Sequence, residues 1–223
     1  MKCWRSTGPL AAAARAETVL RLPLVKHPSD IVIHTHLENG HPVCIRTIRD
    51  SDAERLREGI ARMSPQSRYL RFFSGASTAP DWVIERLTDV DGHDHIAWGA
   101  VDMGLADEPA IGAVHAFRHA DDEDSAEFSV GVLDDYHGLG LGKLLTATIL
   151  LHARTEGLAG FTVNILGQNK SARDFATSLG AEYERLEDGV MQFQMDVAKA
   201  IRALRAECDP PGMADVFRAF DEG

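Results

Sequence analysis

The chain has 223 residues, 44% of them hydrophobic, so one well-packed domain is the default expectation. A formal net charge of −11 argues against a broad basic surface for nucleic acid and suits attraction to cationic amines. Three widely spaced cysteines argue against a disulfide framework, and no apolar run approaches the roughly 18 residues of a membrane span. We therefore expect a cytoplasmic protein without nucleic-acid or membrane partners.

The first half of the sequence predicts an N-terminal arm followed by strands and helices. Residues 1–30 have no sustained hydrophobic period, so we expect a flexible arm there. Asn39-Gly40 is a hairpin turn signal, and Ser64-Pro65 ends one helix and begins another. The expected elements are strands at 31–37 and 43–46, a helix capped by Asp50 or Ser51 that runs to Met63, helices beginning at 65 and at 80, and strands at 96–101 and 111–117.

The stretch from Glu127 to Leu151 combines a strand, a glycine-rich turn and a helix. Phe128, Val130 and Val132 alternate with their neighbours in the pattern of a half-buried strand. The turn His137-Gly138-Leu139-Gly140-Leu141-Gly142 has glycine at every second position, so backbone amides can approach a ligand with no Cβ in the way. The following helix presents unpaired N–H groups and a partial positive charge at the same place. This pattern predicts a phosphate ligand.

Two common phosphate loops do not fit this turn. A Walker A loop needs glycine at position 137 and Ser or Thr at position 144, where the chain has His137 and Leu144. A dinucleotide fingerprint that starts at Gly138 would need its third glycine at Lys143. The remaining pattern is a Val-rich strand followed by [Gln/Arg]-x-x-Gly-x-[Gly/Ala], with His in place of Gln or Arg.

The rest of the chain predicts one parallel strand, a second hairpin and a helical tail. A strand at 161–166 should run parallel to the Glu127 strand, because a helix lies between them. Asn169 opens a helix that ends at Gly180, and strands at 183–186 and 190–195 form the hairpin. Two short helices near 198–207 and 214–220 either cover the core or form a homodimer contact, and the sequence leaves both open.

Three stretches resemble the GCN5-related N-acetyltransferases (GNAT), and within them the acetyltransferase domain of bacterial Pat-type protein lysine acetyltransferases. They are the glycine-rich loop, Ile45 to Asp52, and the narrower run Ser64-Pro65-Gln66-Ser67-Arg68-Tyr69-Leu70-Arg71-Phe72-Phe73. The resemblance covers about residues 42–196. It implies an α/β domain at 31–197, with a mixed, mostly antiparallel sheet of about seven strands splayed at its centre and flanked by helices, and a helical tail at 198–223.

The resemblance implies transfer of an acetyl group from acetyl-CoA to an amine by direct attack. A protein lysine is the acceptor it favours; a small amine acceptor and a non-catalytic CoA-binding module are the alternatives. An ammonium with a pKa of about 10 must lose a proton before it can attack, so a base is required. In this family a strand glutamate before the loop often serves. Glu127 matches that position, and its alternative role is a cross-strand ion pair.

The resemblance also implies a set of cofactor-binding residues. Backbone groups of the two valines would bond to the pantetheine arm if the strands splay apart. Lys143 is otherwise a solvated first-turn residue, and Asn169 is otherwise the N-cap of its own helix. The predicted set is Val130, Val132, His137, Gly138, Leu139, Gly140, Leu141, Gly142, Lys143, Asn169 and Ala172.

Two further positions bear on the chemistry. The tyrosine that often protonates the departing thiolate in relatives is replaced by Ala176, so water, another residue such as Ser171, or no protein group supplies that proton. The run from Ser64 to Phe73 either packs in the core or lines the acceptor side. No metal is expected, because the paired histidines lack carboxylate or cysteine partners at a recognisable spacing.

Overall fold

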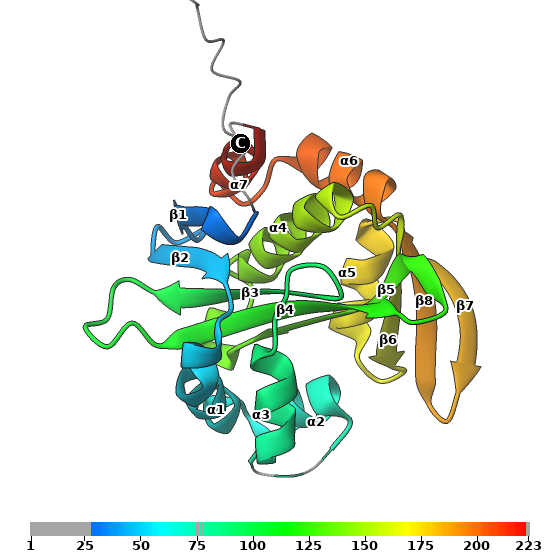
Figure 1. The fold of residues 1–223 in the computed structure, drawn as a ribbon, viewed down its shortest axis with the longest axis horizontal. Helices are drawn as coiled ribbons and strands as arrows, with labels where there is room; N and C mark the ends of the chain where they lie inside the picture. The colour runs from blue at the N-terminus through cyan, green and yellow to red at the C-terminus, as the bar shows by residue number, and fades with distance from the viewer. Residues whose placement is uncertain (1–27, 75, 77, 222–223) are drawn as a thin grey trace, which may run out of the picture.

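The structure is a computed structural model that describes residues 28–74, 76 and 78–221 (Figure 1). The predicted arm at 1–30 lies outside these residues, except for a 3-10 turn at Pro28–Asp30. The strands are β1 (Val32–His36), β2 (Pro42–Thr47), β3 (His95–Asp102), β4 (Ala110–His119), β5 (Asp122–Val132), β6 (Gly160–Leu166), β7 (Glu182–Glu187) and β8 (Val190–Asp196). The helices are α1 (Ala53–Arg62), α2 (Pro65–Phe72), α3 (Asp81–Thr88), α4 (Leu141–Thr155), α5 (Lys170–Ser178), α6 (Val197–Glu207) and α7 (Met213–Asp221).

One mixed sheet of eight strands organises the described part of the chain, which agrees with the eight strands predicted from the sequence pattern and is one more than the approximate number that the resemblance implied. Its order is β1-β2-β3-β4-β5-β6-β8-β7. Every neighbouring pair is antiparallel except β5 and β6, which are parallel as predicted from the helix between them. Helices α1 to α3 lie on one face of the sheet, and α4, α6 and α7 lie on the other (Figure 1).

The sheet opens between its two parallel strands. β5 pairs with β6 only from Ser125 to Phe128, whereas it stays paired with β4 as far as Val132. On the other side, β6 stays paired with β8 as far as Leu166. The predicted splay is therefore confirmed, and it leaves the ends of β5 and β6 without each other as partners.

Helix α4 is buried almost all round, because the sheet covers one side and the tail helices cover the other. Its residues from Leu144 to Ala153 are all buried. Ile201 and Leu204 of α6 and Val216 of α7 belong to the same hydrophobic core. The helical tail thus holds in place the helix whose N-terminus follows the glycine-rich turn. Among the helices in the described ranges, none combines the length and apolar character that a bilayer crossing requires.

Two buried histidines of β3 and β4 form a hydrogen-bonded pair on the face of the sheet that α1 to α3 cover. His95 Nδ1 donates to the Asp89 carbonyl oxygen at 2.6 Å, so in the neutral ring its Nε2 accepts, from His115 Nδ1 at 3.1 Å. Burial lowers the pKa of His95. Burial also lowers the pKa of His115, well below its ordinary value, and the charge of Arg71 lowers it further.

This pair makes stability depend on pH. Because both pKa values are lower in the folded than in the unfolded state, the unfolded chain binds more protons once the pH falls below about 6.5. We expect the free energy of unfolding to decrease by up to about 1.4 kcal/mol per pH unit for each histidine between pH 6.5 and 5.5. Denaturant titrations at pH 7.5, 6.5 and 5.5 measure this. His115→Gln should flatten the slope, and a wild-type curve that is level over this range would contradict the prediction.

Candidate active site

A cleft with a volume of about 720 Å³ occupies the opening between β5 and β6. It extends from α2 across the end of β5 and the glycine-rich turn to α5. The predicted cofactor residues that line it are Val130, Val132, His137, Gly138, Gly140, Leu141, Gly142, Lys143, Asn169 and Ala172. Leu139 is the exception, since it packs against the core and its carbonyl oxygen accepts from Glu38 N at 3.2 Å.

The backbone at the end of β5 faces this cleft. Leu133 N donates to Ile111 O at 2.9 Å, which identifies a hydrogen-bonded pair of the β4–β5 ladder. Because such pairs alternate along an antiparallel ladder, the N–H and C=O groups of Val130 and Val132 point away from β4, toward β6. Beyond Phe128 no β6 residue pairs with them. An extended chain with amide groups can therefore bond there as an added strand.

The glycine-rich turn presents further free amides. Gly138 and Gly140 have φ values of +71° and +83°, which favour glycine. The first backbone bond of α4 runs from Leu144 N to Gly140 O at 3.1 Å, so the amides of residues 141–143 have no partner within the helix. The turn therefore has the glycine conformation and the unpaired amides on which the predicted phosphate site depends, and phosphate binding at the start of α4 stays a prediction.

Two side chains of the predicted set are engaged by the protein itself. His137 Nε2 donates to Val132 O at 2.9 Å, so the ring ties the turn to the strand end. Lys143 Nζ lies 3.0 Å from Glu207 Oε1 and 3.3 Å from Asp209 Oδ2. Burial opposes the charge of Lys143, but its hydrogen bonds to these carboxylates raise the pKa above its ordinary value. Lys143 is therefore not the solvated residue of the alternative interpretation.

Asn169 has the capping role that the sequence offered as an alternative. Its Oδ1 accepts from Ala172 N at 3.1 Å at the start of α5, while its side chain also lines the cleft. The side-chain nitrogen takes no part in this cap. The two predicted roles are therefore compatible in one residue. Ala176 lines the apolar end of the cleft, beside Phe175 and Leu179.

Glu127 lies at the edge of the cleft, where β5 and β6 begin to separate. Its side chain is exposed, and Asn164 Nδ2 of β6 donates to its Oε1 at 3.4 Å. The lining of the cleft begins one residue later, at Phe128. A carboxylate in this position is open to water and lies beside the last bonded pair of the splayed strands.

The Ser64 to Phe73 run both supports and lines the cleft. Asp134, just before the turn, accepts from Ser64 N, Ser64 Oγ and Ser67 Oγ at 2.9, 2.8 and 2.7 Å. Although burial opposes it, these bonds lower the pKa of Asp134 to about 2. Leu70 and Arg71 of the same run face the cleft. Sequence reasoning missed Asp134, and its only local signal was an acidic residue beside a glycine-rich turn.

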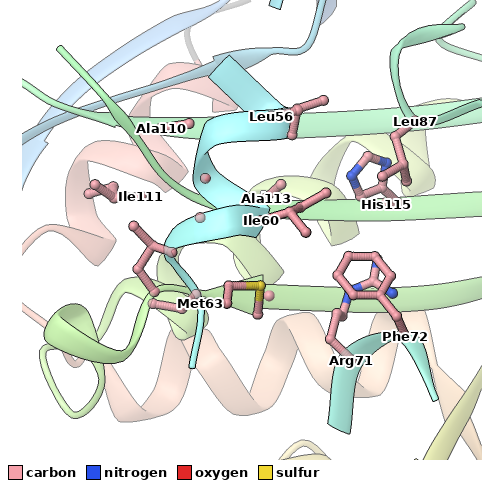
Figure 2. Close-up of a pocket in the computed structure, with 15 residues that line it drawn as sticks. Leu56, Ile60, Met63, Arg71, Phe72, Leu87, Ala110, Ile111, Ala113 and His115 are labelled. Carbon is pink, nitrogen blue, oxygen red and sulfur yellow. The ribbon is translucent and has the colours of Figure 1, made fainter. Parts of the chain in front are cut away.

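A second, smaller pocket adjoins the cleft on the α1 face of the sheet (Figure 2). It has a volume of about 60 Å³ and is almost wholly apolar. Leu56 and Ile60 of α1 cover it, and His115 lies at its far end (Figure 2). Arg71 lines both this pocket and the large cleft. Within the ranges described, no three potential metal ligands come together.

Comparisons with known proteins show which family the sequence matches. The family model described as "Acetyltransferase (GNAT) domain" matches residues 43–182. An acetyltransferase of Pseudomonas aeruginosa is 30% identical over 158 residues, which cover 70% of this chain and 83% of that protein. The acetyltransferase Pat of Mycolicibacterium smegmatis is 28% identical over 165 residues, 74% of this chain and 49% of Pat, so the chain spans about half of Pat.

A solved structure is similar over most of the described residues. The crystal structure of the GNAT domain of S. lividans PAT superposes with a TM-score of 0.69 at 26% identity, covering 77% of this chain and 99% of that domain. The family match spans the strand, turn and helix that border the cleft, and the superposition shows that the two domains share a fold. The chain is therefore an acetyltransferase that belongs to the GNAT family.

Proposed function

We propose that this acetyltransferase transfers the acetyl group of acetyl-CoA to the side-chain amine of a protein lysine, with Glu127 as general base. The observation that carries the proposal is the open end of β5, where unpaired backbone groups lead directly to the free amides at the start of α4. An extended amide-bearing arm that ends in a diphosphate matches both parts of that surface.

The cleft fits such a donor at each end. A Cβ at Gly138 would meet no atom within 4 Å, so there is room above the turn for a bulky anion. The amides of Leu141, Gly142 and Lys143 would hold its phosphates. The C=O group of Val130 and the N–H group of Val132 would hold the arm, while His137 keeps the Val132 carbonyl engaged. Asn169 and Ala172 line the opposite side.

Glu127 would supply the base that the acceptor needs. The carboxylate accepts a proton from the ammonium, directly or through one water, and the neutral amine then attacks the thioester carbonyl. The C–S bond breaks, and CoA leaves as a thiolate that takes up the remaining proton of the attacking nitrogen by way of solvent. The Val130 amide points into the opening and would donate to the carbonyl oxygen as negative charge develops there. Asn164, bonded to Glu127, would orient the carboxylate. No covalent bond to the enzyme is needed.

The protein lysine is the acceptor implied by the resemblance to Pat-type enzymes, and identities of 28% to Pat and 26% to the S. lividans domain support it. A small amine is the competing acceptor, because a net charge of −11 suits any cationic amine.

Acetyl transfer to lysine-containing peptides should exceed transfer to polyamines. We expect kcat/KM to be at least about tenfold higher for the peptides, since a tenfold preference requires only about 1.4 kcal/mol of additional contact with the acceptor. A thiol-release assay with acetyl-CoA, confirmed by mass spectrometry of the product, measures both. Equal or greater turnover of polyamines would transfer the assignment to small amines, and no turnover of either class with CoA bound would refute catalysis.

A further inference from the structure

Arg71 projects from α2 onto the end of β5 that β6 leaves unpaired. Its Nη2 donates to Ser129 Oγ at 2.8 Å. The aliphatic part of the side chain lies over Gly131, where an added Cβ would be 3.5 Å from Arg71 Cδ. The Phe72 ring lies 5.0 Å from the guanidinium carbon, and Figure 2 shows both side chains at the border of the apolar pocket. This cation therefore lies between the small pocket and the large cleft.

The positive charge of Arg71 has no carboxylate partner within 4 Å among the described residues. This contrasts with arginines elsewhere in this acidic chain, such as Arg46 with Asp52 and Arg57 with Asp81. Burial lowers the pKa of Arg71 to about 10, and the negative charge of Glu127, which does not contact Arg71, opposes this shift, so the guanidinium stays protonated at neutral pH. A guanidinium carries five N–H donors, and one bond to a hydroxyl leaves most of them available. An incompletely paired cation in apolar surroundings is costly unless a ligand completes it.

The position of Arg71 relative to Glu127 suggests what that ligand is. Glu127, Ser129 and Gly131 are alternate residues of β5, so they share one face and are spaced by about 6.8 Å. Arg71 lies over the last two. When the amine of an acceptor reaches Glu127, a second group of the acceptor that lies about 6.8 Å from the amine would therefore contact the guanidinium. A planar guanidinium binds a carboxylate through two parallel N–H···O bonds, and a carboxylate is the anionic group that peptides and amino acids with a free amine can carry.

We propose that Arg71 binds a carboxylate of the acceptor, so that the enzyme acts on amines that carry an acidic group nearby. This inference rests on the acetyl transfer proposed above, and it names the class of acceptor. The carboxylate belongs either to an acidic residue beside the target lysine or to a free amino acid. The almost wholly apolar lining of the small pocket lowers the local dielectric on one side of the guanidinium, which strengthens its interaction with an incoming anion.

Binding to the complex of the full chain with CoA tests this without requiring turnover. The probes are two matched pairs: a lysine peptide with a neighbouring Glu or Gln, and free lysine or lysine amide. By calorimetry we expect the carboxylate member of at least one pair to bind about tenfold or more tightly, as for a charge-assisted bond. The pair that shows the preference identifies the source of the carboxylate. Equal binding within both pairs, including no binding at all, would overturn the proposal.

Variants at two positions of α2 separate carboxylate binding from a structural role. Arg71→Met should abolish the preference and Arg71→Lys should restore part of it, while CoA affinity stays unchanged. Arg68→Met is the matched control, because Arg68 donates instead to the carbonyl oxygens of Ala61 and Met63, at 3.2 and 2.7 Å. It should lower stability and keep the preference. A preference that survives Arg71→Met would overturn the proposal. If the wild-type chain shows the preference but transfers no acetyl group, only the proposed function is contradicted.

Discussion

Replacing Glu127 by Gln is expected to lower kcat by about 10²- to 10⁴-fold while CoA affinity stays within twofold of wild type. Gln keeps the size of the side chain and can still contact Asn164, but it cannot accept a proton from the attacking ammonium. The Glu127 carboxylate lies beside the cleft, whereas the groups proposed to bind CoA are backbone amides of the turn and of the end of β5. The substitution should therefore slow the chemical step and leave CoA binding unchanged. Steady-state kinetics and calorimetry with CoA measure the two quantities separately.

A matched substitution on the same strand controls for charge. Glu123→Gln removes an equally exposed carboxylate of β5, four residues earlier, where the side chain is remote from the opening of the sheet. We expect kcat to change less than twofold. An unchanged kcat for Glu127→Gln would remove Glu127 from the mechanism and leave water as the base. Loss of CoA affinity in the same variant would instead show that Glu127 supports the cleft.

Gly140→Ala should weaken CoA binding at least about tenfold and destabilise the fold by about 2–4 kcal/mol. Gly140 precedes α4 with a φ of +83°, a conformation that costs an L-residue about 1–2 kcal/mol. An added Cβ would also lie 2.6 Å from Pro210 Cγ and 3.2 Å from Glu38 Oε1. Relief of that contact must move the turn whose amides face the cleft. Denaturant unfolding and calorimetry with CoA measure both effects.

The substitution Gly157→Ala separates the effect of backbone strain from the effect of the steric contact with Pro210. Gly157 has a similar φ of +79°, but an added Cβ would meet no atom within 4 Å, and it lies past the opposite end of α4. We expect a loss of about 1–2 kcal/mol and unchanged CoA affinity. Equal effects of the two variants on CoA binding would show that the turn is not a specific site for the cofactor.

Local patterns in the sequence were sufficient to predict the order of the elements. The period-two runs at 96–101 and 111–117 became β3 and β4, and the glycine-rich turn became the start of α4. β5 begins at Asp122, five residues before the expected start, because its acidic first residues pair with the end of β4 across a bulge. Hydrophobic periodicity is silent about such residues, since both of their faces are exposed.

The partners of charged and polar side chains could not be predicted in the same way. Lys143 is paired with Glu207 and Asp209, and Asp134 bonds to Ser64, across more than 60 residues in each case. Arg71 reaches Ser129, 58 residues away. Such contacts depend on which helices pack beside the turn, which no short-range pattern specifies.

The amino-acid pattern alone thus established the strand, turn and helix that present free amides, because φ preference and alternation are properties of neighbouring residues. The packing of distant segments settled the rest: the exposure of Glu127, the engagement of Lys143 and His137, and the contact of Arg71 with Ser129. A side chain's partner and its access to water depend on where the whole chain places other atoms, and that information is spread over the entire fold.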